Sequence, residues 1–390
     1  RTLPLALATL ASLLPLACGG EDDAGCQATK GTPARTWPVD GASGLRVADL
    51  PPLPDLPVWE DNPVTPEKRT LGVTLFSDLR LSSSGTVSCA NCHSPLAEFQ
   101  SNTPLDLPSR SLPEVTPPLP RHTPSLLNLV YADVLHWDGS ESDLYESMVL
   151  PFAEPNMNLT DVPRGDVWTI DVPTAQRKLR EKVTTEIPGY GALFQAAFGE
   201  DPADLTPEEV WHRAGQAMAV FIRDAVSKNS PFDRWNAGED GAISDAAVQG
   251  LDFFMGAGKC IECHRGPMIT DYEFHNLSLM RLDDAGEPVD LGRARITKDP
   301  ADLGKFLTPT LRSVNRTSPF LHDGHEASLL AVLEHHANGP ALESENHDPI
   351  LEGMARVGDD EYRALVALIK SFEGEPLDLD FLGTIPEFPK

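Results

Sequence analysis

The five residues Cys89-Ala90-Asn91-Cys92-His93 constrain this chain more than any other stretch. Two cysteines three positions apart, with a histidine beside the second, form the C-x-x-C-H pattern typical of c-type haem attachment. Two thioether bonds hold the porphyrin edge, and the adjacent histidine can ligate the iron. A redox dithiol or half of a zinc site also uses C-x-x-C. Cys260-Ile261-Glu262-Cys263-His264 repeats the whole pattern, and this repetition favours two covalently bound haems over both alternatives.

The chain is strongly acidic, with a formal net charge of −28 over 390 residues. This charge argues against nucleic-acid binding, which needs basic surface to displace counterions from phosphate. It suits the steering of a cationic protein partner, although acidity also serves solubility alone. The length allows two domains with separate cores, and 36 prolines predict long irregular connections.

Residues 1–18 resemble the export signal of a bacterial lipoprotein. Arg1 supplies the charge, the apolar run that follows is too short to span a bilayer, and Ala17-Cys18-Gly19-Gly20 is similar to a lipoprotein cleavage site. We expect an exported, periplasmic protein that meets a membrane only through a lipid anchor. Residues 19–64 are rich in Gly, Pro and Asp and predict a tether followed by an extended arm.

Capping residues and apolar spacing predict most of the helices. A helix is expected from Thr65-Pro66-Glu67, with Leu71, Leu75 and Leu79 on one apolar face. Further helical segments are expected near Leu126, at 143–149, from Thr206 to about Val226, after Ser244, at 328–336 and at 359–372, whereas 270–320 reads as irregular. We predict a mostly α fold with two cytochrome c-like haem domains, 65–228 and 229–390, and long irregular loops.

Beyond the haem motifs, residues 65 to about 375 resemble the bacterial di-haem cytochrome c peroxidase and MauG family. The matching stretches are Leu79-Arg80-Leu81-Ser82-Ser83-Ser84-Gly85, Arg121-His122-Thr123-Pro124-Ser125, His136-Trp137-Asp138-Gly139, Pro188-Gly189-Tyr190, Ser230-Pro231-Phe232-Asp233-Arg234, Pro309-Thr310-Leu311-Arg312-Ser313-Val314 and Ser318-Pro319-Phe320-Leu321-His322-Asp323-Gly324. The resemblance implies that a small cytochrome or cupredoxin donates electrons at the C-terminal haem and that hydrogen peroxide is reduced to water at the N-terminal haem.

The resemblance also assigns roles to single residues. It makes His93 the proximal ligand of the peroxide-binding haem and His264 that of the electron-transfer haem, with Trp137 relaying electrons between them. His336, 14 residues after His322, stands where the peroxidases have methionine and MauG has tyrosine. A second histidine ligand would lower the potential relative to methionine. The neighbouring His335 points about 100° away on a helix, so only one of the pair can face the iron.

The peroxide side departs from the family pattern. Breaking the O–O bond needs a group that takes and returns a proton, and the resemblance favours Glu154 for this role. A gapped alignment would instead place Asn156 there, and an amide cannot shuttle a proton. Residues 94–120 lack the histidine that caps the resting iron in many family peroxidases. Either His122 caps the iron or the iron is open at one face, and we favour the open iron.

Two further expectations rest on the resemblance. Backbone carbonyls of Thr317 and Pro319 would hold an interdomain calcium ion, with His122 replacing the family's asparagine ligand. Family members are often dimers, so a homodimer is compatible with the sequence. The rival readings are a MauG-like oxidase that modifies a partner protein and a di-haem electron carrier without enzymatic activity. The sequence leaves the physiological donor and the need for reductive activation open.

Overall fold

A computed structural model describes residues 50–101, 120–155, 157–162, 168–338 and 346–377. The predicted export signal and most of the predicted tether lie outside these residues. So do Asn156 and residues 102–119 of the loop after the first haem motif. Within the described chain, no helix combines the length and the apolar character needed to cross a membrane.

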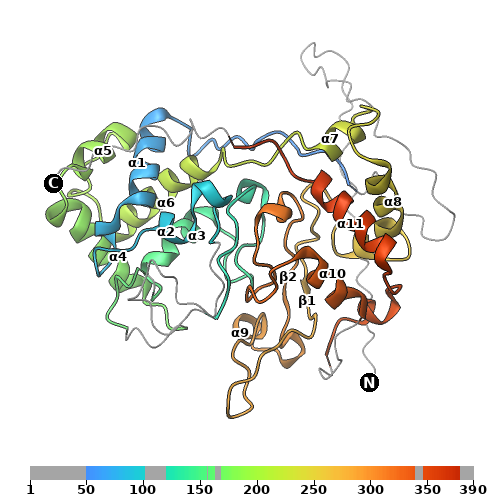
Figure 1. The fold of residues 1–390 in the computed structure, drawn as a ribbon. Helices are drawn as coiled ribbons and strands as arrows, with labels where there is room; N and C mark the ends of the chain where they lie inside the picture. Colours follow the sequence, from blue (N-terminus) through green and yellow to red (C-terminus); the bar gives the residue numbers. More distant parts are fainter. Residues whose placement is uncertain (1–49, 102–119, 156, 163–167, 339–345, 378–390) are drawn as a thin grey trace, which may run out of the picture. The chain divides into compact units, whose positions relative to one another are not determined.

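Helices dominate the described chain, which confirms the prediction of a mostly α fold (Figure 1). The α-helices are α1 Pro66–Ser77, α2 Cys89–Cys92, α3 Leu144–Val149, α4 Val172–Glu181, α5 Tyr190–Phe198, α6 Pro207–Ile222, α7 Pro231–Asn236, α8 Asp245–Met255, α9 Ala294–Thr297, α10 Leu329–Asn338 and α11 Asp359–Ser371. A π-helical turn, Lys182–Glu186, extends α4. The two named strands, β1 Phe274–His275 and β2 Phe306–Leu307, pair antiparallel with Phe274 opposite Leu307.

The helices begin where their capping residues predict. The Thr65 hydroxyl accepts a hydrogen bond from the Lys68 amide at 3.2 Å, and the Ser244 hydroxyl accepts one from the Ala247 amide at 3.2 Å. Such bonds satisfy amides of the first turn, which have no partner within the helix. Thr206 and Glu209 form a reciprocal capping box at the start of α6.

The predicted helix ends are less accurate. The first helix stops at Ser77, so Leu79 lies beyond it and is 42% exposed instead of continuing the apolar face. The sixth helix ends at Ile222, before the predicted Val226. Near Leu126 the chain forms only the 3₁₀ turn Leu129–Tyr131 within the described residues. After Ser77 the chain forms the 3₁₀ turn Leu79–Leu81, in which Leu81 rather than Leu79 is buried.

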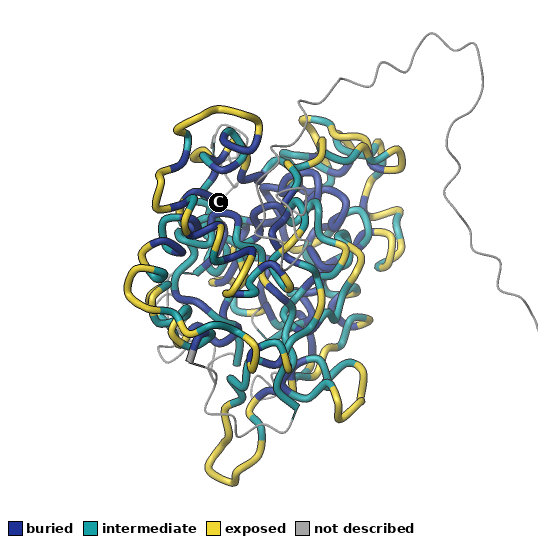
Figure 2. The backbone as a smooth tube through the Cα atoms, turned by 90° about the vertical axis from the view of Figure 1, so that its right-hand side faces the viewer, coloured by how far each residue is buried: buried dark blue, intermediate teal, exposed yellow. Residues whose placement is uncertain are grey.

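Two hydrophobic clusters lie on either side of the predicted boundary. One draws its buried residues from Leu71 to Ala225, and the other joins Leu50 to residues between Phe232 and Phe372. Buried segments fill the interior and exposed ones form the outer loops (Figure 2). The clusters separate near residue 228, while residues 34–390 form one compact unit, so the division into two haem domains stays a prediction.

The described part of the predicted arm contacts both clusters. Leu50 is buried in the second cluster, and its carbonyl accepts a hydrogen bond from the Asn236 side chain at 3.1 Å. Asn62 is buried at the other end, where its side chain donates to the Gln216 carbonyl of α6 at 3.0 Å. Residues 50–64 therefore run along the chain's two cores, as the term extended arm implies.

Glycines permit close packing at the main helix contacts. A Cβ on Gly250 of α8 would lie 2.2 Å from the Ala364 carbonyl oxygen of α11, too close for any side chain.

We expect Gly250→Ala to destabilise the protein by about 1–3 kcal/mol, because the helices must separate. Gly191→Ala in α5 is the control, since its Cβ would meet no atom closer than 4.0 Å. Urea titration should show a lower free energy of unfolding for Gly250→Ala than for the wild type. For Gly191→Ala the free energy of unfolding should rise by about 0.5–1 kcal/mol. Equal midpoints would contradict the close approach.

Candidate haem-binding site

Both C-x-x-C-H motifs open onto one cavity of about 540 Å³. The second motif follows α8, whereas the first is carried by α2. Much of the cavity wall is apolar, as a porphyrin requires. The predicted site residues in this wall are Cys89, Cys92, His93, Trp137, Glu154, Cys260, Cys263, His264, Thr317, Pro319 and His336. The fold thus brings together every predicted site residue that it describes.

The two motif histidines are held in the form that an iron ligand needs. His93 Nδ1 lies 3.0 Å from the Phe99 carbonyl oxygen, and His264 Nδ1 lies 3.2 Å from that of Ile269. A proton on Nδ1 that donates to the carbonyl leaves the Nε2 lone pair available for a metal. Burial lowers the pKa of each imidazole to about 4, so both rings are neutral. The histidines of both motifs therefore make the same hydrogen bond to a backbone carbonyl.

The motif cysteines line the cavity as uncharged thiols. Burial raises the pKa of the Cys89 and Cys260 thiols to about 12, so both sulfurs are uncharged near neutral pH. A zinc site or a reactive dithiol would need thiolates. The cavity, the neutral imidazoles and the uncharged thiols fit a haem at each motif. Covalent attachment itself stays a prediction.

A further histidine lines the same cavity as His264, the candidate ligand of the second motif. Of the two histidines of α10, His336 lines the cavity, and its Nδ1 lies 2.8 Å from the Val332 carbonyl oxygen. His335 Nε2 instead lies 3.0 Å from the Leu277 carbonyl oxygen. His336 is close enough to His264 to contribute, after burial, to the low pKa of that imidazole. This placement agrees with the choice of His336, whose ligation stays a prediction.

Trp137 is fixed by hydrogen bonds to both halves of the chain. Its indole Nε1 donates to the His122 carbonyl at 2.9 Å, and its own carbonyl accepts from the Leu307 amide of β2 at 2.8 Å. The His122 amide in turn donates to the His322 carbonyl at 2.7 Å. The indole ring therefore has a defined position in the cavity wall, as a relay would require.

Trp137 and His322 occupy equivalent positions of a local structural repeat. One isolated β-bridge, Leu135 with Glu141, encloses Trp137, and another, Phe320 with Glu326, encloses His322. Each loop ends in an Asp-Gly pair whose glycine has a φ near 65°, a conformation that favours glycine. Sequence analysis missed this repeat, although the two Asp-Gly pairs were its signal. The His322 ring stacks on Phe306, with centroids 3.7 Å apart.

A buried charge network braces the segment of Trp137. Asp138 is fully buried and pairs with Arg121 at 2.7 Å and Arg295 at 2.6 Å, while Arg121 also pairs with Asp290 at 2.6 Å. Burial would raise the pKa of Asp138, but the two guanidinium groups outweigh it and lower that pKa. The guanidinium carbons of Arg121 and Arg295 each lie 5.2 Å from the centroid of the Trp168 ring. The pairs Asp138–Arg295 and Arg121–Asp290 join residues 157 and 169 positions apart, so no local sequence pattern predicts them.

Glu154 lies beside the first haem motif. It lines the cavity, and its charge adds to the effect of burial in raising the pKa of Cys92 to about 11. The alternative residue, Asn156, lies outside the described residues. The buried His122 places Nε2 2.8 Å from the Ser101 carbonyl oxygen, which occupies that nitrogen. This contact favours the open iron over a His122 cap, and both remain predictions.

The two residues of the predicted calcium site lie together in the same wall. Thr317 and Pro319 both line the cavity, and the intervening Ser318 carbonyl accepts a hydrogen bond from the Gln100 side chain at 2.8 Å. Thr317 Oγ1 donates to the Val314 carbonyl at 2.9 Å. The calcium ion stays a prediction.

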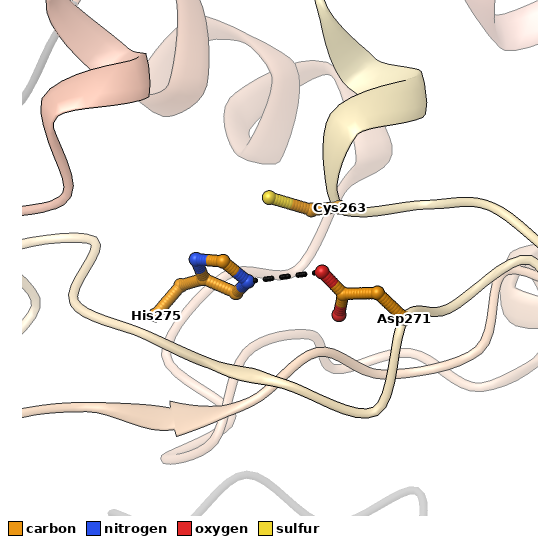
Figure 3. A group of neighbouring side chains, drawn as sticks. All are labelled: Cys263, Asp271 and His275. Atoms are coloured by element: carbon orange, nitrogen blue, oxygen red, sulfur yellow. Dashed lines mark hydrogen bonds and ion pairs between the residues drawn. The ribbon is translucent and has the colours of Figure 1, made fainter. Parts of the chain in front are cut away.

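His275 forms a charge cluster at the second motif that sequence analysis missed (Figure 3). Its Nε2 lies 3.1 Å from Asp271 Oδ2 and its Nδ1 lies 2.5 Å from Asp348 Oδ2. Cys263, Asp271 and His275 are the one group of metal-ligating residues found in the described chain. Because Cys263 belongs to the haem motif, we interpret the group as an ion-pair cluster. Asp271, then Cys263 and Asp348, raise the pKa of His275 to about 11, so the ring is cationic.

His275→Gln tests this charge cluster. A folded-state pKa of about 11 exceeds the unfolded value of about 6.5, so the stabilisation is complete below pH 6.5. It is lost progressively as the pH rises toward 11. The difference in unfolding free energy between wild type and His275→Gln should therefore be largest near pH 6 and shrink by pH 10, in urea titrations of both proteins. Asp348→Asn should act in the same direction but less. A difference that is constant with pH would contradict a cationic His275.

Two C-x-x-C-H motifs that line one cavity are typical of di-haem proteins, and known proteins with similar sequences belong to that class. The family model for di-haem cytochrome c peroxidase matches residues 66–241. The chain is 34% identical to the methylamine utilization protein MauG of Methylorubrum extorquens, over 84% of this chain and 83% of the relative. It is also 34% identical to the cytochrome-c peroxidase IdrP1 of Denitromonas iodatirespirans, over 75% and 78%.

A solved structure supports the same conclusion. The crystal structure of a MauG-like protein associated with microbial copper homeostasis matches with a TM-score of 0.68 and 26% identity, over 87% of this chain and 98% of that one. The chain belongs to the di-haem cytochrome c peroxidase family, which includes MauG. Membership in this family implies c-type haem cofactors and oxidoreductase chemistry.

Proposed function

We propose that this protein reduces hydrogen peroxide to water with electrons from a small donor protein, a cytochrome or a cupredoxin. Electrons enter at the second haem motif, pass by way of Trp137 and reach the first. The observation that carries the proposal is the position of Trp137, whose ring lies in the wall of the one cavity that both motifs share. Each turnover consumes one peroxide, two electrons and two protons and yields two waters.

The chain's residues divide the work as follows. His93 and His264 would hold the two haem irons through Nε2, and His336 would supply a second nitrogen ligand to the C-terminal haem. A bound haem supplies an iron that can bind oxygen ligands and exchange electrons. Glu154 accepts a proton at its carboxylate from one peroxide oxygen and returns it to the other. Trp137 is held by its N–H bond to the His122 carbonyl, so its ring does not need to reorganise.

Oxidation of a partner protein is the second candidate function. It is supported by equal identity, 34%, to a relative named MauG and to one named cytochrome-c peroxidase. In that case electrons flow from the partner protein to the haems, and no cytochrome donor is needed.

Steady-state peroxide consumption by the holoprotein distinguishes these candidates. We expect turnover with a reduced small cytochrome and a high-spin signal in electron paramagnetic resonance of the resting protein, from an open N-terminal iron. Absence of turnover across donors of different potential would overturn the peroxidase proposal. If a purified partner were then oxidised by peroxide, the second candidate would hold. An entirely low-spin protein that is inactive in both assays would be an electron carrier.

We further propose export to the periplasm with a lipid anchor at Cys18, and a calcium ion at Thr317 and Pro319. Export is supported by the signal-like residues 1–18 and by the attachment of c-type haem outside the bacterial cytoplasm in this family. Cell fractionation with radiolabelled fatty acid tests the anchor. Metal analysis of the purified protein before and after chelation tests the calcium ion.

A further inference from the structure

A hydrogen-bonded hairpin spans residues 281–289. Leu282 and Pro288 form a β-bridge, and the Val289 amide donates to the Arg281 carbonyl at 2.9 Å. At the tip, Asp283 Oδ1 accepts hydrogen bonds from the amides of Ala285 and Glu287, at 2.8 and 2.9 Å. These bonds hold the hairpin in one shape, so its exposed side chains form a defined surface.

That surface is unusually apolar. Leu282 is 57% exposed on the hairpin face that it shares with Pro288. Val289 is 40% exposed on the opposite face, because neighbouring side chains of a strand alternate, and the following Leu291 is 41% exposed. Nine large apolar residues are exposed in the described part of the chain, and three of them fall within these ten positions. The segment extends outward beyond α9 in Figure 1, and Figure 2 shows an exposed loop at the same height. Grouped exposed apolar residues are typical of interaction surfaces, because isolated chains gain nothing from leaving them in water.

Acidic residues surround the apolar ones. Asp283, Asp284 and Glu287 are exposed beside the single basic residue Arg281. The whole chain carries a formal net charge of −28, so its long-range field has the same sign. Exposed apolar side chains beside this acidic rim complement a partner whose own apolar patch is ringed by lysine or arginine.

The hairpin emerges from the cavity wall at the second haem motif. Leu277 and Leu279, just before it, both line the cavity. The Leu277 carbonyl lies 3.0 Å from His335 Nε2, and His335 precedes the candidate ligand His336. The hairpin is therefore continuous in sequence with the segment that walls the cavity at the second motif.

We propose that residues 281–291 are the docking surface for a small cationic redox protein that delivers electrons to the second haem. The proposal rests on the proposed function for its direction of electron flow. The acidic rim accelerates encounter, and burial of Leu282, Val289 and Leu291 holds the complex.

Charge reversal at the rim tests this docking surface. Asp284→Lys with Glu287→Lys should lower kcat/KM for reduced mitochondrial cytochrome c, a small cationic probe, by about 10-fold or more at low salt. The salt dependence of the rate should also flatten. The matched control is Glu60→Lys with Asp61→Lys, which reverses the charge of two exposed acids before α1. The fold decrease in kcat/KM for this control should be less than half of that for the hairpin variant. Leu282→Ser with Leu291→Ser should weaken binding without changing the salt dependence. Peroxide reduction by a small neutral reductant should be the same in all variants.

The proposal is overturned if the hairpin variants lose no more than the control variant. It is also overturned if they lose the same rate with the small reductant, because the defect would then lie in the haem path. Binding of oxidised cytochrome c, measured by calorimetry without peroxide, tests the surface independently of turnover. If the wild type shows no peroxidase activity but binds the probe more tightly than the hairpin variants do, the proposed function fails and the docking surface stands.

Discussion

We expect His336→Met to raise the midpoint potential of the second haem by on the order of 100 mV, within the roughly 0.8 V that axial ligands span. Methionine is a weaker donor to ferric iron than imidazole, so the reduced state gains in relative stability. His336 lines the cavity from α10, with His264 facing the same cavity from the second motif. A second haem with two histidine ligands would therefore have a lower potential than one with histidine and methionine.

Spectroelectrochemical titration of the two haems measures this change. His335→Met is the control, because His335 interacts with the Leu277 carbonyl and should leave both potentials unchanged. The absorption spectrum of His336→Met should also gain the weak near-infrared charge-transfer band that is typical of methionine ligation, and that of His335→Met should not. Equal potentials in wild type and His336→Met would exclude His336 as a ligand.

We expect Glu154→Gln to lower the rate of peroxide reduction by about 10²–10⁴-fold, the usual contribution of a general acid–base group. The amide keeps the shape of the side chain but cannot accept the peroxide proton. Glu154 lines the cavity next to Cys92, which places a carboxylate beside the first haem motif. The haem content and both midpoint potentials should stay close to those of the wild type, since no ligand is changed.

Single-turnover mixing of the reduced protein with peroxide isolates this step from electron delivery. Glu141→Gln is the matched control, because Glu141 does not line the cavity and its loss should leave the rate intact. The competing assignment makes the opposite prediction. If Asn156 fills the proton-transfer position, Glu154→Gln has no effect and Asn156→Glu accelerates the reaction.

Much of the helical framework was predictable because helix starts depend on residues close in sequence. Thr65, Thr206 and Ser244 each satisfy an amide three residues ahead, and the local pattern contains the whole interaction. Helix ends depend on what the chain packs against next, so the exposure of Leu79 and the early end of α6 were not predictable.

The sequence by itself determined the two haem motifs, their histidines and the candidates Trp137, Glu154 and His336, because these follow from residue types at short spacings or from the family resemblance. The tertiary structure alone decided that these residues share one cavity and that His336, not His335, faces it. It also decided that Asp138 pairs with Arg295 from 157 positions away, and that His275 lies between two carboxylates. Such contacts depend on how distant segments pack, and no local pattern of residues records that packing.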